Sequence, residues 1–153
     1  MTTERTALAR TETRRFHDVA VGERLPELAI ALTPTLIVAT AVATRDFRDV
    51  HHDRDRAQAQ GSNDIFMNIL TTNGFVGRYI TDWAGPEAVL KAVAIRLGAP
   101  NYPYDTMTLT GAVTATQVIR GEGVVDVRVV GSNSLGDHVT ATVCLALPMG
   151  EGT

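Results

Sequence analysis

The chain has 153 residues, of which 44% are hydrophobic and 20% are charged, and its formal net charge is −3. This length and this composition are typical of one globular domain. The small negative charge gives no general attraction to nucleic acid or to an anionic membrane surface, and no apolar run is long enough to span a bilayer. We therefore expect a protein with neither nucleic-acid nor membrane partners.

The N-terminal segment differs in character from the rest of the chain. Residues 1–20 are rich in arginine and threonine and lack the apolar centre of a secretory signal, so we predict a disordered polar extension there and one domain over 21–150. The chain has a single cysteine, Cys144, and so cannot form an internal disulfide. That pattern is typical of the reducing cytoplasm, where we expect this protein to act.

The first predicted elements follow the extension. The stretch "LPELAIALT" alternates large apolar residues with smaller or polar ones, which predicts a strand. Thr33 and Pro34 then have the residue types of a helix N-cap and a first helical position. The next ten residues, "TLIVATAVAT", are apolar on every side and rich in β-branched residues. Their pattern leaves a helix and a buried strand equally open.

A second helix is predicted over 68–83. Large side chains recur there at spacings near three and four, which indicates a helix with one buried face: Leu70, Val76, Tyr79, Ile80 and Trp83. The same segment contains Gly74 and Gly77, each of which costs about 1 kcal/mol relative to alanine in a helix. We interpret these two glycines as places where another backbone approaches the helix closely.

The remainder of the chain has the period-two pattern of strands, with a turn at "NSLGD" before the last of them. The alternating apolar residues fall into four groups: Val89, Val93, Ile95 and Leu97; Met107, Leu109, Val113 and Ile119; Val125, Val127 and Val129; and Val139, Ala141, Val143, Leu145 and Leu147. One long helix and an antiparallel sheet of about five strands can bury each other if the sheet curls around the helix. The fold class is therefore α+β, a single hotdog domain. Its open sheet edge predicts an oligomer.

Charge is concentrated immediately before the predicted central helix. Asp46 and His51 are separated by four residues in a polar stretch. A carboxylate and an imidazole on one loop can bind the same water and divide general-base and general-acid work. Asn68 then lies at the helix N-terminus, where free N–H groups and the helix dipole can hold a developing oxyanion. Together these features suit the addition of water to a carbonyl-conjugated double bond.

These residues resemble the motif of the MaoC-like (R)-specific enoyl-CoA hydratases and dehydratases. Asp46 and His51 match its acid and histidine, and Asn68 matches the position, usually glycine, whose backbone N–H binds the thioester oxygen. The resemblance extends from about Leu25 to Pro148. Five further blocks, "ATRDFRDVHHDRD", "AQGSNDIFMNIL", "RYITDWAGP", "YDT" and "NSLGDHVTATV", are similar to the small subunit of actinobacterial steroid-side-chain enoyl-CoA hydratases.

The resemblance implies a specific reaction and assembly. A trans-2-enoyl-CoA, here a steroid side-chain thioester, would be hydrated with Asp46 as base and His51 as proton donor, although the sequence does not separate these two roles. No cofactor or metal is implied, since CoA is part of the substrate. The small chain would work with a second MaoC-like hotdog subunit in a heterodimer or heterotetramer, with a homodimer as the alternative.

The sequence also departs from the wider motif, Gly-Asp-x-Asn-Pro-x-His. Arg45, Arg48 and Asp49 stand at its Gly, Asn and Pro positions, and Asn68 replaces the oxyanion glycine. A backbone donor survives any side chain, so the change at Asn68 need not abolish the oxyanion site. The substitutions in the loop agree with the steroid subgroup.

Three rival interpretations remain. The first is a metal site, for which the neighbouring candidates are His51, His52, Asp53 and Asp55, although these are crowded in sequence and no distant ligand set completes a shell. The second is a hotdog acyl-CoA thioesterase, which commonly carries an acid on or near the central helix, where the first acid here is Asp82. The third is a non-catalytic acyl-CoA-binding subunit, because a fold alone does not confer activity.

Overall fold

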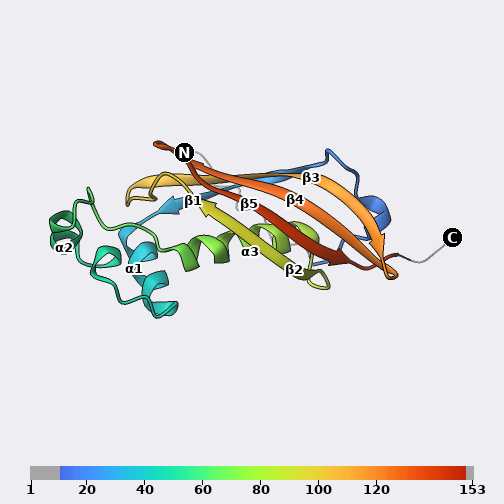
Figure 1. Ribbon diagram of the computed structural model, residues 1–153, viewed down its shortest axis with the longest axis horizontal. Helices are drawn as coiled ribbons and strands as arrows, with labels where there is room; N and C mark the ends of the chain where they lie inside the picture. Colours follow the sequence, from blue (N-terminus) through green and yellow to red (C-terminus); the bar gives the residue numbers. More distant parts are fainter. Residues whose placement is uncertain (1–10, 151–153) are drawn as a thin grey trace.

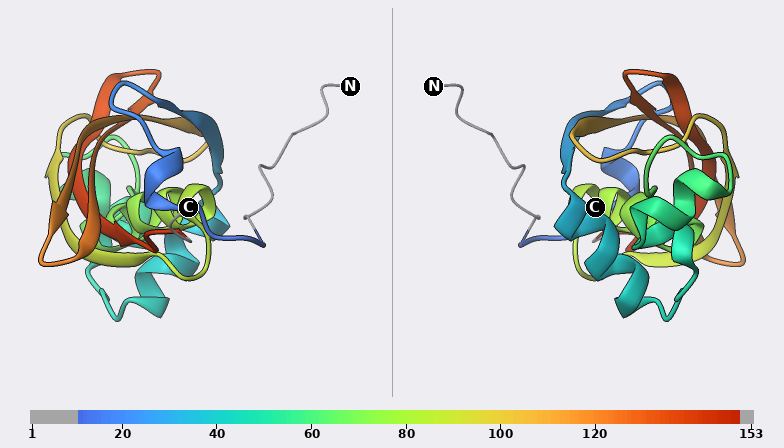
Figure 2. Two further views of the ribbon diagram at one scale, coloured as in Figure 1. Left: turned by 90° about the vertical axis from the view of Figure 1, so that its right-hand side faces the viewer. Right: turned by 90° about the vertical axis from the view of Figure 1, so that its left-hand side faces the viewer.

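The protein is described over residues 11–150 by a computed structural model, in which a curved sheet wraps around one long helix (Figures 1 and 2). The sheet has five strands in the order β1-β3-β4-β5-β2, and every neighbouring pair is antiparallel. The strands are β1 (Arg24–Leu32), β2 (Val89–Leu97), β3 (Asp105–Ile119), β4 (Glu122–Asn133) and β5 (Gly136–Leu147). The predicted hotdog fold is confirmed.

The helix in the curve of the sheet is α3 (Ile69–Ala84). Val76 and Ile80 are fully buried on it and pack with the inward valines of β4 and β5. The prediction that Leu70 shares this face is wrong, because its side chain is 51% exposed. A spacing of six residues is about 600° of helical rotation, which places Leu70 far from the stripe of Val76. Thr72, four residues before Val76, occupies the stripe instead and is fully buried.

The ambiguous apolar stretch is a helix, α1 (Pro34–Ala43). Thr33 caps it, since its hydroxyl oxygen accepts a hydrogen bond from the Leu36 N–H at 3.0 Å, and Pro34 opens the first turn. Two short elements follow, the 3₁₀ turn η2 (Asp49–His51) and α2 (Arg54–Ala59). Figure 1 shows α1 and α2 at one end of the molecule, beside the start of α3.

Within residues 11–150, Gly74 and Gly77 of α3 do not meet the backbone of another element. A Cβ added at Gly74 would find no atom within 4 Å, and one at Gly77 would meet only the Leu90 side chain, at 3.7 Å. The interpretation as close approaches within this chain is therefore wrong. Instead, this side of α3 adjoins the edge strand β2, where Val89 and Leu97 are also exposed. The result is an open apolar border of helix and sheet edge.

The packed domain begins before residue 21. A 3₁₀ turn, η1 (Phe16–Asp18), buries Phe16 in the core, and Val19 is buried beside it. Gly123 on β4 makes room for that ring, because a Cβ there would lie 2.3 Å from Cγ of Phe16. The core therefore includes part of the segment predicted as an extension, whose residues 1–10 lie outside the described part. None of the helices within residues 11–150 has the length and apolar character needed to cross a membrane.

Candidate active site

Asp46 is placed by the C-terminus of α1. The Asp46 N–H donates to the Ala41 carbonyl at 2.9 Å, and the Arg45 N–H donates to that of Val42 at 3.0 Å. This pair of bonds is the Schellman motif, which requires a left-handed residue just after the helix. Arg45 has that conformation, with φ of 57°. This left-handed conformation explains why the wider motif has glycine at this position. Arg45 adopts the same conformation here with some backbone strain.

His51 lies at the end of η2 and is 4% exposed. Its Nδ1 is 2.7 Å from the carbonyl oxygen of Phe66, whose ring also meets the imidazole edge-on. A carbonyl oxygen only accepts, so Nδ1 carries a proton and donates it. The other nitrogen, Nε2, lies 3.3 Å from Oδ2 of Asp46. The nitrogen through which His51 can accept or release a proton is therefore Nε2, which faces Asp46.

Asn68 connects the Asp46 loop to the start of α3. It is the N-cap, and its Oδ1 accepts a hydrogen bond from the Thr71 N–H at 2.9 Å. Its Nδ2 donates to Oδ2 of Asp46 at 3.1 Å and to Oγ1 of Thr44 at 2.8 Å. The backbone N–H of Asn68 makes no hydrogen bond to another group of residues 11–150. The three residues selected from the sequence thus lie together, and an amide donor remains for a ligand.

The environment of Asp46 keeps its carboxyl group ionised. Burial, the largest single influence, raises its pKa, but the Asn68 hydrogen bond and the neighbouring His51 and Arg48 together shift the pKa below its usual value. A carboxylate that is ionised at neutral pH can accept a proton. The Asp46 carboxylate and the imidazole nitrogen through which His51 can exchange a proton therefore lie within 3.3 Å of each other.

The residues between His51 and α2 serve a structural purpose. Asp53 is the N-cap of α2 and accepts the Arg56 N–H at 3.1 Å. His52 is partly exposed, and its nearest carboxylate oxygen, on Asp49, is 3.9 Å away. Within residues 11–150, no three His, Cys, Asp or Glu side chains are grouped so that they could hold a metal ion.

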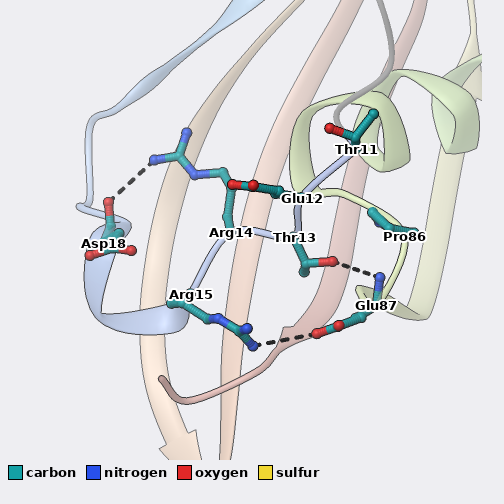
Figure 3. Close-up of a pocket in the computed structure, with 8 residues that line it drawn as sticks. All are labelled: Thr11, Glu12, Thr13, Arg14, Arg15, Asp18, Pro86 and Glu87. Carbon is teal, nitrogen blue, oxygen red and sulfur yellow. Dashed lines mark hydrogen bonds and ion pairs between the residues drawn. The ribbon is translucent and has the colours of Figure 1, made fainter. Parts of the chain in front are cut away.

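The opposite end of α3 carries a polar surface pocket of about 640 Å³ (Figure 3). Its walls are the chain before η1 and the turn after α3. Arg15 and Glu87 form an ion pair there at 3.4 Å, and Oγ1 of Thr13 accepts the Glu87 N–H at 2.8 Å. These groups bind one another on an exposed surface. The full length of α3, about 24 Å for 16 residues, separates this pocket from Asp46 and His51.

Two partners of the site have no signal in the sequence. Thr44 accepts from Asn68, and the carbonyl of Phe66 fixes the tautomer of His51. Asn68 itself is recognisable as a helix cap, but its contact with a carboxylate 22 residues earlier is tertiary. Such contacts depend on how α1 and α3 pack, which residue types do not reveal.

The sheet order, the central helix and this cluster define a hotdog protein of the MaoC-like class. The likeness in fold extends to distant proteins, such as the MaoC-like dehydratase from Rhodospirillum rubrum, with 17% identity, a TM-score of 0.74 and coverage of 86% of this chain and 94% of that chain. No protein-family model matches the sequence.

A relative and a solved structure, each with about 60% sequence identity to this chain, identify its family within the MaoC-like class. The chain is 61% identical over 127 residues, 83% of its length, to the 3-oxo-4,17-pregnadiene-20-carboxyl-CoA hydratase beta subunit of Mycobacterium tuberculosis, of which the match covers 95%. A chain in the crystal structure of the ChsH1-ChsH2 complex from that organism superposes with a TM-score of 0.80 and 60% identity, over 84% of this chain and 98% of that one. The protein belongs to the family of this hydratase beta subunit.

Proposed function

We propose that this protein is the catalytic subunit of a heteromeric enoyl-CoA hydratase that adds water to the side-chain double bond of a steroid enoyl-CoA in the cytoplasm. The observation that carries the proposal is the contact of Asp46, His51 and Asn68 at the start of α3. The beta subunit to which the chain is 61% identical is named as a hydratase of a pregnadiene-carboxyl-CoA, a steroid thioester. The reaction needs no separate cofactor, because CoA is part of the substrate.

In the proposed mechanism, the thioester oxygen binds the backbone N–H of Asn68 at the positive end of the α3 dipole. A water molecule beside Oδ2 of Asp46 and Nε2 of His51 attacks C3 and transfers a proton to Asp46. His51, which enters the cycle as an imidazolium protonated on both nitrogens, delivers its Nε2 proton to C2, where the enolate has formed. The proton on Asp46 then moves to His51 across their 3.3 Å contact, which restores both groups.

The second hotdog subunit is assigned to the open border of α3 and β2. Leu70 on α3 and Val89 on β2 are each about half exposed, and Leu97 extends the apolar edge. The free backbone groups of an edge strand pair readily with another strand, and the glycines of α3 leave room for a neighbouring helix. The homologous chain of known structure occurs in a complex, ChsH1-ChsH2, which favours a heteromer over a homodimer.

The rival activities have weaker support in the geometry. A thioesterase acid on α3 would have to be Asp82, which lies near the C-terminal end and is paired with Arg78 at 3.2 Å. A subunit that only binds acyl-CoA has no use for a carboxylate and an imidazole held at 3.3 Å by buried partners. Hydration is the reaction that uses both groups together.

The test is Asp46→Asn in the protein purified with its partner, assayed by loss of enoyl absorbance with short and steroid enoyl-CoA. General acid–base catalysis contributes about 10²- to 10⁴-fold, so kcat should fall by about that factor while the fold is retained. Asp49→Asn, in the same loop, is the matched control. Among residues 11–150 the Asp49 side chain pairs with Arg56 and His52 and forms no hydrogen bond or ion pair with Asp46 or His51, so its kcat should match wild type. A folded Asp46→Asn protein with wild-type turnover would refute the proposed mechanism, and release of free CoA would favour the thioesterase.

A further inference from the structure

A second histidine, His138 on β5, is buried beside the site and takes no part in the proposed mechanism. It is 2% exposed, and both ring nitrogens have partners. Nδ1 lies 2.6 Å from the carbonyl oxygen of Ala99, and Nε2 lies 2.8 Å from Oγ1 of Thr72. Thr72 is in the first turn of α3 and is fully buried. The imidazole therefore connects β5, the segment after β2 and the start of the central helix.

The direction of each hydrogen bond follows from its partners. The Ala99 carbonyl only accepts, so Nδ1 of His138 carries a proton. Burial is the dominant influence on His138 and lowers its pKa, against a smaller opposite effect of the Ala99 bond, so the ring is neutral. A neutral ring that is protonated on Nδ1 offers a lone pair on Nε2. The Thr72 hydroxyl also lies 3.4 Å from the Asn68 carbonyl oxygen, but the shorter contact and the lone pair on Nε2 direct its single proton to His138.

This connection ends at the residue that carries the proposed oxyanion donor. Asn68 precedes Thr72 by one turn, and its carbonyl accepts the Thr72 N–H at 3.2 Å. Any movement of Thr72 thus shifts both the Asn68 amide and the side chain that Asn68 extends to Asp46. Apolar packing also holds α3 against the sheet, but it is not directional. A buried hydrogen bond at 2.8 Å restricts rotation and sliding of the first turn.

The neighbouring Thr71 provides an internal comparison. It is 6% exposed in the same helical turn, yet its hydroxyl has no hydrogen-bond partner. Of these two buried threonine hydroxyls, only that of Thr72 is bonded, to His138 on the sheet at 2.8 Å and to the Asn68 carbonyl at 3.4 Å.

We propose that His138 and Thr72 are positioning residues. They hold the first turn of α3 so that the backbone N–H of Asn68 can bind the thioester oxygen. This inference rests on the proposed hydratase function. Neither residue touches substrate in it, and both act through Asn68. Because negative charge on the thioester oxygen develops in the transition state, misplacement of the amide should lower kcat more than it raises KM.

The decisive experiment compares Thr72→Val, Thr72→Ser and Thr71→Val in the protein purified with its partner. Valine has nearly the shape of threonine and removes only the hydroxyl. Displacements of about 1 Å at a reacting centre reduce rates by up to about 100-fold, so we expect kcat of Thr72→Val to fall by about tenfold or more, with KM within about twofold. Thr72→Ser should recover most of kcat, and Thr71→Val should match wild type.

Two further measurements make the result independent of folding defects. The double variant His138→Phe/Thr72→Val should have a kcat no lower than that of the more impaired single variant. Both substitutions remove the same hydrogen bond, the one between His138 and Thr72. The ¹⁵N NMR spectrum of the His138 ring in the wild-type protein should show the tautomer protonated on Nδ1. The opposite tautomer would overturn the inference without any variant.

The possible outcomes distinguish a failure of the positioning role from a failure of the proposed hydratase function. Wild-type kcat in folded Thr72→Val, or an equal loss in Thr71→Val, overturns the positioning role and leaves the hydratase assignment intact. A wild-type protein that hydrates no enoyl-CoA overturns the assignment, and the positioning role with it.

Discussion

The two ends of α3 handle polar groups in opposite ways. At the N-terminal end, Asn68, His51 and His138 are each less than 5% exposed, and each is bonded to fixed groups on other elements. At the C-terminal end, Arg15 and Glu87 pair across an exposed pocket with side chains that are 49% and 62% exposed (Figure 3). Water can replace the exposed contact between Arg15 and Glu87, whereas at the N-terminal end a lost partner leaves a buried group unsatisfied.

The buried groups at the C-terminal end are also different. The Tyr79 hydroxyl and Nε1 of Trp83 are buried without a hydrogen-bond partner in the described residues. Burial, assisted by the charge of Glu27, raises the pKa of Tyr79 to about 12, so the hydroxyl stays neutral. These aromatic residues fill the core and do not orient one another through hydrogen bonds. The comparison shows that α3 is held by apolar packing near its C-terminal end. At its N-terminal end, which carries the proposed active site, it is held by directional hydrogen bonds.

Among the changes that test this comparison, Asn68→Ala should have the largest effect on turnover. It removes the helix cap and leaves the Thr71 N–H and Asp46 with one partner fewer, which should lower the free energy of unfolding by about 1–3 kcal/mol. It also frees the Asp46 carboxylate, so kcat for hydration should fall by about 10- to 100-fold. Urea unfolding and steady-state kinetics measure the two effects separately.

A matched control for that variant is Asn63→Ala, since Asn63 lies in the loop before α3 with an exposed side chain. Both its stability and its kcat should stay close to wild type. If Asn68→Ala keeps wild-type kcat, the position of Asp46 does not depend on the cap, and the N-terminal end is less rigid than its contacts indicate.

A change at the other end should affect stability alone. Gly85 ends α3 with φ of 98°, and a Cβ there would lie 2.5 Å from Cα of Thr13. Gly85→Ala therefore combines backbone strain with a clash, and we expect it to lower the free energy of unfolding by about 2–5 kcal/mol. The kcat of the folded fraction should remain within about twofold of wild type. Gly74→Ala, measured on the chain without its partner, is the matched control, because within residues 11–150 its Cβ meets nothing within 4 Å and its backbone is helical.

Loss of turnover per folded molecule in Gly85→Ala would show that the C-terminal end of α3 also controls the site. A decrease in stability that Gly74→Ala causes only in the presence of the partner would instead show that the partner fills the space beside that glycine.

Patterns local in sequence predicted most of the fold. The valines at alternate positions of β4 and β5 are fully or almost fully buried, because a strand with one face on a core shows its period directly. The Thr33 cap was recognisable from two adjacent residues. Leu70 was assigned wrongly, because a spacing of six was accepted as helical. Recognition of the family and the hydratase function are confirmed by the relatives, and the related ChsH1-ChsH2 complex supports a second hotdog subunit.

The candidate site was predicted only as far as residue types and spacing allow. Asp46 and His51 lie near one another in the chain, so their contact follows from a short loop, and the roles assigned to them stay predictions. His138 had no signal, since it appears as one polar residue at the start of an apolar strand. The structural role of His138 depends on its hydrogen bond to Thr72. The two residues are 66 positions apart in sequence and meet only because the sheet wraps around α3.

The smallest effect is expected from Arg15→Gln at the exposed pocket. Its ion pair with Glu87 is 3.4 Å long and about half exposed at each side chain, and such surface pairs contribute about 0–1 kcal/mol. The free energy of unfolding should change by less than about 0.5 kcal/mol, and the difference should diminish further when salt is added, because exposed charges are screened. The kcat for hydration should be unchanged. A loss above about 1 kcal/mol that persists in high salt would mean that the C-terminal end is held by specific bonds after all, and the contrast between the two ends of α3 would then be one of degree.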